Sequence, residues 1–503
     1  MSSFEQLLGG FAVALTWKGL LYCFLGCLWG TVVGVLPGFG PVAGMTLLLP
    51  LTFGLEPATG IIMLTGIFYG AMYGGSTTSI LVRIPGEAAS VVTCIDGYEM
   101  ARQGRAGPAL MISAVGSFIG GTVSILGLML VAPPLAKVMI EIGPSVEVVL
   151  ILFALVVISV VSAGSRVKTA TMIVLGLTLG SVGMDKLTGV QRFTFGNLSL
   201  TDGLSFTALA IGLFGISELL LNLERSDTIK AIRPKFWDLV PKLKDLRDSA
   251  GAVGRGSVIG FIFGIIPGVS HVVSTFVSYA IEKKLSRNPE RFGKGAIEGV
   301  AGPETANNAV TGTAMIPLLA LGIPSIPATA ILLSALTIHG VQPGPLLMTE
   351  HPEVFWGLVA SMYIGNFILL VLNLPLVSVF VNLLRIPYAW LVPAILVISV
   401  VGVYSVDYNP FSIWIMGLSG LAGYLLRKFK YEMAPLLLAL VLGDRLEEKF
   451  RLSLTLSGGS YATFVDNASL IVLGISVSLI VGVQAIAWAF GYRKSFADEA
   501  ESA

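Results

Sequence analysis

The stretch GCLWGTVVGVLPG, residues 26–38, is an apolar run with glycine at every fourth position, and it ends in a Pro-Gly pair. The stretch GSVIGFIFGIIPG, residues 256–268, has the same spacing 230 positions later. One such pattern could arise by chance. The same spacing of glycines and proline found twice in one chain indicates an internal duplication.

A second pair of landmarks supports this duplication. Ile84-Pro85 and Ile323-Pro324 each follow a segment of small residues. They are 239 positions apart rather than 230, so the second copy holds about nine extra residues between its landmarks. Duplicated apolar halves with paired broken helices are typical of secondary transporters.

The composition is that of a membrane protein. Hydrophobic residues make up 54% of the chain and charged residues 12%, against roughly 25% charged residues in soluble proteins. Apolar runs long enough to cross a hydrocarbon core of about 30 Å recur along the chain. They include residues 146–163, 204–221, 354–374, 390–403 and 468–490. We therefore expect an all-α polytopic membrane protein with about ten to twelve transmembrane helices.

Lysine and arginine are distributed unevenly over the loops that the duplication makes equivalent. Residues 54–59 contain no basic residue, whereas their counterparts, residues 283–294, contain several. The next pair of loops reverses this pattern, because residues 83–105 hold three arginines and residues 325–352 hold no Lys or Arg. Basic loops mark the cytoplasmic side, so we expect two repeats of inverted topology, each containing a helical hairpin broken at Pro-Gly.

These patterns predict how the chain is organised in the membrane. The expected parts are a first transmembrane repeat (1–223), a cytoplasmic linker (224–255), a second transmembrane repeat (256–490) and a cytoplasmic tail (491–503). The linker is expected to hold a short amphipathic helix near residues 236–246. Residues 432–466 leave two crossing counts open, because a short apolar run there precedes a charged stretch.

The two Pro-Gly breaks form the predicted substrate site. A break at membrane depth is tolerated only where it is buried in protein or lines a polar cavity. The helix that resumes after each break offers free N–H groups and a partial positive charge, which suit a carboxylate. The residues expected to bind substrate are Pro37, Gly38, Phe39, Gly40, Ser76, Thr77, Pro267, Gly268, Val269 and Ser270.

Hydroxyl and amide oxygens near the breaks are the expected ligands of a coupling cation, with Na⁺ favoured over H⁺. These residues are Thr78, Ser79, Asn307, Asn308, Thr311 and Thr313. As an alternative, the hydroxyls of these segments only bond to carbonyls of their own helices. For the glycine rows themselves, close helix packing is favoured over substrate contact.

Ionisable residues near the apolar segments are further candidates. Glu298 and Glu304 follow the basic loop, and we expect them to lie in a solvated helix start, with a part in ion coupling as the alternative. His271 follows the second break and could titrate near neutral pH. His339 and His351 fall in an expected external loop and are predicted to be solvated.

Five segments carry a family resemblance. They are GVLPGFGP (34–41), YGGSTTSIL (73–81), DGYEMARQG (96–104), NPERFGKGAIEGV (288–300) and PETANNA (303–309). From about Leu20 to Leu456 the chain resembles the large permease subunit of tripartite tricarboxylate transporters, the TctA family. Arg83 departs from the family pattern, in which a small polar residue is expected there. This change would affect either the substrate or the cytoplasmic anchoring.

The resemblance implies an inner-membrane permease that works with a small four-helix membrane subunit and a periplasmic solute-binding protein. Family members take up citrate and other carboxylates, driven by a cation gradient rather than by ATP. The absence of a Walker motif from the sequence agrees with this. We therefore expect cation symport of tricarboxylates or dicarboxylates.

Two other kinds of function stay open at the level of the sequence. One is a stand-alone ion-coupled transporter or channel for another small anion, and the other is an intramembrane enzyme. The sequence shows no nucleophile–base pair, HExxH motif or carboxylate dyad on facing positions, which disfavours the enzyme. We expect no catalytic residue, no bound metal and no cofactor apart from the coupling cation.

Overall fold

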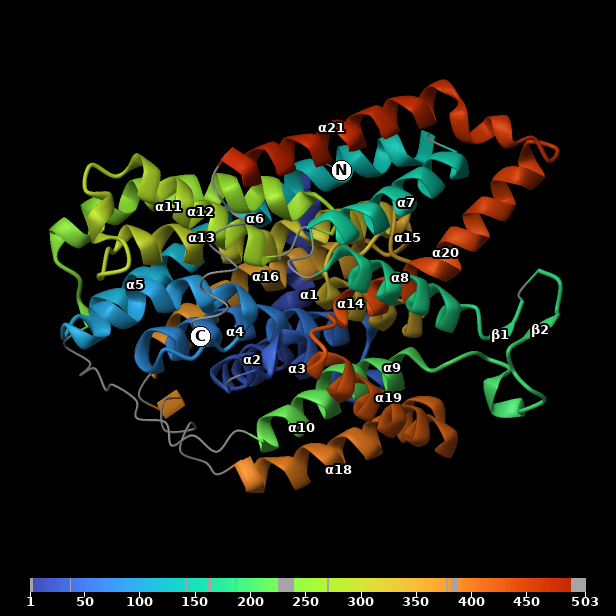
Figure 1. Cartoon of the computed structure of the whole chain (residues 1–503), viewed down its shortest axis with the longest axis horizontal. Helices are drawn as coiled ribbons and strands as arrows, with labels where there is room; N and C mark the ends of the chain where they lie inside the picture. The colour runs from blue at the N-terminus through green and yellow to red at the C-terminus, as the bar shows by residue number, and fades with distance from the viewer. Residues whose placement is uncertain are drawn as a thin grey trace.

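The computed structural model describes residues 3–36, 38–141, 143–161, 165–185, 187–224, 239–268, 271–376, 379–380 and 388–489. These residues are helical almost throughout, as Figure 1 shows. Four of the described helical segments are long and apolar enough to cross a membrane: residues 17–35, 106–141, 206–223 and 352–373. The prediction of an all-α polytopic membrane protein is confirmed.

The elements before the expected linker are, in order, α1 (Ser3–Ala14), α2 (Trp17–Val35), α3 (Gly40–Leu48), η1 (Leu49–Gly54), α4 (Pro57–Val82), η2 (Ala88–Ser90), α5 (Val91–Arg102), α6 (Ala106–Glu141), α7 (Pro144–Val161), α8 (Arg166–Gly180), β1 (Gly183–Met184), β2 (Gln191–Arg192), η3 (Leu198–Leu200), α9 (Phe206–Ala210), η4 (Ile211–Ile216) and α10 (Ser217–Leu223). The two strands pair antiparallel, with Gly183 opposite Arg192.

The later elements are α11 (Leu243–Ile265), α12 (His271–Leu285), η6 (Pro289–Arg291), α13 (Glu298–Thr313), η7 (Pro317–Leu321), α14 (Pro327–Ile338), α15 (Leu347–Glu350), α16 (Pro352–Asn373), α18 (Tyr388–Asp407), α19 (Pro410–Lys428), α20 (Ala434–Leu456), η8 (Tyr461–Val465) and α21 (Asn467–Ala489). Residues 434–456 thus form a single helix in the region where two crossing counts were open.

Both apolar runs break where the sequence predicts. Helix α2 ends at Val35 and α3 begins at Gly40, while α11 ends at Ile265 and α12 begins at His271. The backbone at Gly38 has φ +80° and at Gly268 φ +84°. Residues with a side chain rarely adopt this left-handed region, which explains why glycine follows the proline in both breaks.

The glycine rows allow the close approach of two helix pairs, α2 with α4 and α11 with α13, which Figure 1 shows as two groups. A Cβ at Gly30 would lie 2.3 Å from the carbonyl oxygen of Ile67, and a Cβ at Gly260 would lie 2.4 Å from that of Ala306. These contacts support the packing interpretation of the glycines, because only a hydrogen fits at either position.

The register of the two pairs also matches. Gly30 packs on a residue 37 positions further along the chain, and Gly260 on one 46 positions further. The difference is nine, the number of extra residues that the landmarks in the sequence require in the second copy. The duplicated pattern therefore corresponds to a duplicated helix–helix contact.

The segment expected to link the repeats is helical in its second part. Helix α11 begins at Leu243, well before the expected boundary at residue 256, and Asp245 caps its start by accepting the backbone N–H of Lys242 at 3.1 Å. Asp245 also pairs with Arg105 at 2.6 Å, which fixes this end of α11 beside the start of α6. Residues 236–238 of the expected amphipathic helix lie outside the described residues.

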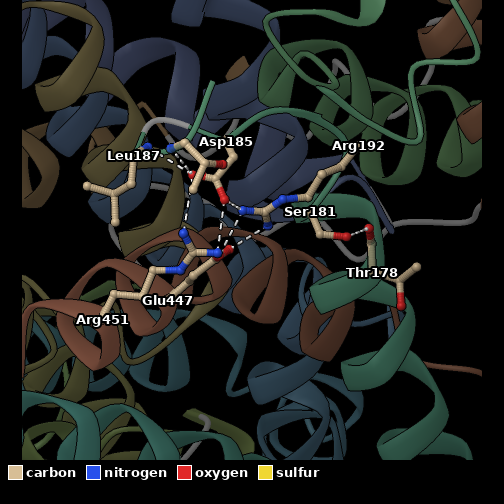
Figure 2. A network of polar contacts seen from close by, with 8 residues as sticks. Thr178, Ser181, Asp185, Leu187, Arg192, Glu447 and Arg451 are labelled. Atoms are coloured by element: carbon tan, nitrogen blue, oxygen red, sulfur yellow. Dashed lines mark hydrogen bonds and ion pairs between the residues drawn. The ribbon is translucent and has the colours of Figure 1, made fainter. Parts of the chain in front are cut away.

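An ionic network joins the β-hairpin to α20, and Figure 2 shows it from close by. Arg192 makes two hydrogen bonds of 2.9 Å to the carboxylate of Glu447. Arg451, one turn further along α20, pairs with Asp185 at 2.9 Å and with Glu447 at 2.5 Å. The hairpin, which projects at the right of Figure 1, is therefore held to the C-terminal half of α20 by charge rather than by an apolar core.

Candidate functional site

A buried carboxyl group on α13 gathers hydroxyl groups from three other helices. Ser76 of α4 donates to Glu304 Oε2 at 2.5 Å, and Thr93 of α5 donates to Oε1. The hydroxyl of Ser113 of α6 lies near the same carboxyl. Glu304 is 1% exposed, so the prediction of a solvated helix start is wrong for this residue.

The sequence of α13 explains why Glu304 is buried. Residues 299–313 are all buried, and most of them are Gly, Ala, Thr or Asn. Small side chains let neighbouring helices approach closely: a Cβ at Gly120 of α6 would lie 2.3 Å from the carbonyl oxygen of Thr305. Helix α13 therefore runs through the interior of the protein, and its polar side chains must find partners there.

A second buried carboxyl group lies next to the first. Glu87, at the start of η2, accepts the backbone N–H of Ala89 at 2.6 Å and the side-chain amide of Asn307 at 3.2 Å. A Cβ at Gly75, the residue before Ser76 on α4, would lie 2.9 Å from Cγ of Glu87, so Glu87 packs beside the segment that donates to Glu304. Asn307 and Ser76 were both predicted site residues, and the structure brings them to the same pair of carboxyl groups.

Asn308 and Thr311 continue this polar strip along α13. The side-chain amide of Asn308 donates to Ser117 Oγ of α6 at 2.7 Å. Thr311 Oγ1 lies 3.3 Å from Nε2 of His271, the first residue of α12. His271 is buried, and its ring packs edge-on against Phe68 of α4 at 5.8 Å.

Several predicted cation ligands use their hydroxyl protons within the helices. Thr78 and Ser79 both donate to the carbonyl of Gly75 at 3.0 Å, and Thr313 donates to that of Ala309 at 2.8 Å. Thr311 likewise donates to the carbonyl of Asn307 at 3.0 Å. These bonds match the alternative in which the hydroxyls bond only to carbonyls of their own helices. A hydroxyl that donates its proton can still accept through its oxygen lone pairs. Thr77 is buried.

The two breaks are packed against different helices. A Cβ at Gly38 would lie 2.4 Å from Oε1 of Glu218 on α10, whereas a Cβ at Gly268 would lie 2.9 Å from the backbone nitrogen of Ile158 on α7. The N–H of Gly268 donates to the carbonyl of Ser325 at 2.9 Å. No described contact joins one break to the other.

The other predicted substrate residues differ in how far they are buried. Phe39 is buried, and Gly40, with φ +64°, would have no atom within 4 Å of an added Cβ. Pro267 is partly exposed. The remaining three lie outside the described residues: Pro37, Val269 and Ser270.

The other ionisable candidates have described contacts with residues other than the two carboxyl groups. Glu298 is partly exposed and pairs with Arg291 at 3.5 Å. His339 was predicted to be solvated, but it is partly buried, because its Nε2 lies 3.3 Å from Thr52 Oγ1 and its ring stacks on Phe53. His351 is partly exposed beside Glu353. Arg83 lies over the ring of Tyr98 at 5.9 Å.

Asp96 holds the loop before α13 in place, a role that the sequence did not reveal. Its Oδ1 accepts the backbone N–H groups of Gly293, Gly295 and Ala296 at 2.7–2.9 Å. Its Oδ2 accepts the hydroxyl of Tyr279 at 2.8 Å. Asp96 and this loop belong to two of the segments that carry the family resemblance. The positions of these segments relative to the Pro-Gly breaks did not predict that they are in contact.

A pocket elsewhere in the protein contains none of the predicted residues. Its volume is about 580 Å³, and mainly apolar side chains of α7, α8 and α20 line it, with Asp444 and Glu447 at one side. The polar groups on α4, α5, α6 and α13 therefore remain the candidate site.

Comparisons with known proteins identify the family of the chain. Residues 20–438 match the family described as the tripartite tricarboxylate transporter TctA family. The chain is 47% identical over 483 residues to an uncharacterized 52.8 kDa protein in the TAR-I ttuC' 3' region of Agrobacterium vitis, which covers 95% of this chain and 96% of that protein.

A second relative matches part of the chain. An uncharacterized protein in the TAR-II ttuC' 3' region of the same organism is 49% identical over 219 residues, which is 43% of this chain and 90% of that protein. No solved structure matches the chain. The family match spans all four helices that carry the candidate site, and the chain therefore belongs to the tripartite tricarboxylate transporter TctA family.

Proposed function

We propose that the chain is the permease subunit of a binding-protein-dependent secondary transporter that imports tricarboxylates or dicarboxylates by cation symport. Family membership makes it a multi-pass transporter subunit. The observation that carries the finer proposal is the meeting of Ser76 and Asn307, from the two copies of the duplicated pattern, at two buried carboxyl groups.

The two breaks support a carboxylate as the substrate. Helices α3 and α12 begin after them, and the first N–H groups of a helix have no partner within that helix. Such groups bind anions through hydrogen bonds and the helix dipole, without a buried lysine or arginine. The predicted substrate residues around Gly38 and Gly268 keep this role in the proposal.

Coupling to cations follows from the charge of the substrate. Moving one negative charge inward against a membrane potential costs about 2.3 kcal/mol per 100 mV. Uptake becomes favourable only if at least as many cations enter as there are negative charges on the substrate. Neutral oxygens and the buried carboxyl groups Glu87 and Glu304 are suitable ligands for such cations.

The proposal also specifies the partners, the location and the topology of the permease. Its partners are a periplasmic solute-binding protein and a small four-helix membrane subunit, and it lies in the inner membrane with a cytoplasmic C-terminus. The two repeats have inverted topology, which suits alternating access around a central site. In this proposal the chain carries out no chemical reaction, and its only cofactor is the coupling cation.

Uptake of labelled carboxylates into proteoliposomes tests the proposal. The full complex with its binding protein is given a Na⁺ gradient or a proton gradient in separate reactions. We expect uptake that needs the binding protein and the Na⁺ gradient. Uptake without any cation gradient, or without the binding protein, would contradict the proposal.

The role of the first break is tested in the same assay. Gly40→Ala places a methyl group on a backbone with φ +64° but meets no neighbouring atom, whereas Gly38→Ala also collides with Glu218. We expect Gly40→Ala to reduce uptake while the protein still inserts. Gly54→Ala, at a position with open space and an ordinary φ, is the matched control.

A further inference from the structure

Two buried oxygen atoms on α12 and α13 have no hydrogen-bond partner among the described residues. They are Oδ1 of Asn307 on α13 and Oγ of Ser274 on α12, and both residues are 0% exposed. The amide of Asn307 is oriented by its nitrogen, which donates to Glu87 Oε1 at 3.2 Å, so its oxygen is the free end. Buried polar atoms without a partner are rare and call for an explanation.

The register of α12 against α13 places Ser274 and Asn307 at the same level along the two helices. The two helices run antiparallel: a Cβ at Gly302 would lie 2.9 Å from Ser278 Oγ, and His271 lies against Thr311. Ser274 falls midway between Ser278 and His271 along α12, so it faces the part of α13 that contains Asn307. Helix α12 also contacts η2, whose first cap is Glu87.

Neither buried carboxyl group of this region forms an ion pair with a basic side chain of the described residues. Glu87 and Glu304 are both buried, and the ion pairs of the described residues all involve other acids. A buried carboxylate without compensation is costly, so a cation or a proton must accompany it. Among the described residues, Glu304 accepts hydrogen bonds from the hydroxyls of Ser76 and Thr93, whereas Glu87 Oε1 accepts one from the amide of Asn307.

The kinds of ligand favour a monovalent cation. Among the described residues, no group of three or more His, Cys, Asp or Glu side chains is arranged to hold a metal ion. One carboxylate, one amide oxygen and one hydroxyl oxygen are hard ligands with a total charge of −1. Their charge would be neutralised by a single Na⁺.

We propose that Glu87, Asn307 Oδ1 and Ser274 Oγ form the binding site of the coupling Na⁺. This inference rests on the proposed cation symport and adds Glu87 and Ser274 to the residues expected from the sequence. Because η2 and α12 both supply ligands, Na⁺ would tie the loop after α4 to the helix that begins at the second break. Binding of the cation would thereby fix the break that faces the substrate.

Ser274→Ala is the sharpest test, because the hydroxyl that it removes makes no hydrogen bond in the protein. The matched control is Ser278→Ala, which removes an equally buried and unpartnered hydroxyl one turn away, beside Gly302. The purified full chain is titrated with NaCl at constant ionic strength in choline chloride, and its thermal midpoint is followed. We expect Ser274→Ala to raise the half-saturating Na⁺ concentration about tenfold and Ser278→Ala to leave it unchanged.

Glu87→Gln supplies the second variant. It keeps the shape of the side chain but removes the charge, and we expect the Na⁺-dependent rise of the thermal midpoint to disappear. Equal Na⁺ titrations of wild type, Ser274→Ala and Glu87→Gln would overturn the site, as would a wild-type chain that does not respond to Na⁺.

Uptake measurements distinguish failure of the proposed Na⁺ site from failure of the proposed transport function. If Ser274→Ala proteoliposomes keep the wild-type Na⁺ dependence of carboxylate uptake, the symport stands and the site is wrong. If uptake in the wild type follows only a proton gradient, the Na⁺ site and Na⁺ symport both fall, while carboxylate import remains.

Discussion

Ser76 Oγ donates a 2.5 Å hydrogen bond to Oε2 of Glu304, although the two residues lie 228 positions apart in the chain. Ser76 belongs to a segment that was expected to bind substrate. Glu304 was expected to be solvated, yet it is 1% exposed. This contact therefore joins the two copies of the duplicated pattern. It also makes Glu304, which follows a basic loop in the sequence, part of a buried polar site.

Removing this hydrogen bond should weaken transport. Ser76→Ala leaves one oxygen of a buried carboxyl without its donor, and we expect carboxylate uptake to fall about tenfold. The control is Thr65→Ala, on the same helix, because Thr65 donates only to the carbonyl of Ile61 at 2.8 Å. Initial uptake rates in proteoliposomes, corrected for inserted protein, measure both. Equal rates for the two variants would show that the contact is not needed for transport.

Asp96 should matter for stability more than a single hydrogen bond does. Asp96→Ala leaves three backbone N–H groups and the hydroxyl of Tyr279 without their acceptor, and each lost bond to a charged group is worth about 1.5–3 kcal/mol. We expect a large fall of the thermal midpoint in detergent. Tyr279→Phe removes only one of these bonds and should have a clearly smaller effect. A smaller effect of Asp96→Ala than of Tyr279→Phe would contradict this role.

The glycine rows should tolerate no side chain where they meet another helix. Gly260→Ala places a Cβ 2.4 Å from the carbonyl oxygen of Ala306, so α11 and α13 must move apart. Gly254→Ala lies on the same helix with nothing within 4 Å and should be neutral or slightly stabilising. Thermal unfolding of the two variants compares them directly. If both have the same midpoint, close packing does not explain the glycine spacing.

The proposed inverted topology predicts opposite accessibility of two exposed positions. Lys242, before α11, should face the cytoplasm, and Gln342, in the loop between α14 and α15, should face the periplasm. Single cysteines there can be labelled from outside intact cells, since the three native cysteines are buried. We expect labelling at residue 342 only. Equal labelling of both positions would rule out the inverted arrangement.

The network of Figure 2 should make stability depend on pH. Hydrogen bonds from Arg192 hold the pKa of Glu447 below its ordinary value. A carboxyl whose pKa is lowered by folding adds stability above its unfolded pKa of about 4.3, and loses that contribution as the pH falls through its folded pKa. The thermal midpoints of wild type and Glu447→Gln should therefore differ most near neutral pH and converge below about pH 4.

Glu448→Gln is the control for this pH profile. Glu448 is the next residue on α20, and it is exposed. We expect its midpoint to follow that of the wild type at every pH. A difference between Glu447→Gln and wild type that stays constant from pH 7 to pH 3.5 would mean that the ion pair does not contribute through the charge of Glu447.

The sequence by itself determined the local elements of this protein. The apolar runs became helices, and both breaks fell between the expected residues, because hydrophobic length and the backbone limits of proline and glycine act within a few neighbouring residues. The spacing of glycines also identified which helices could be packed closely. Even the nine extra residues of the second copy reappear in the register of α11 on α13.

Only the tertiary structure decided which polar groups meet. Three contacts join residues about 200 positions apart. They are the hydrogen bond of Ser76 to the buried Glu304, that of Asn307 to Glu87, and that of the loop before α13 to Asp96. A charged residue beside a basic loop can lie either in solvent or in the protein interior. The neighbouring residues in the sequence do not distinguish these two positions. The small residues of α13 decide it, because they let four helices close around a carboxyl group whose hydrogen-bond partners exist only once those helices have packed.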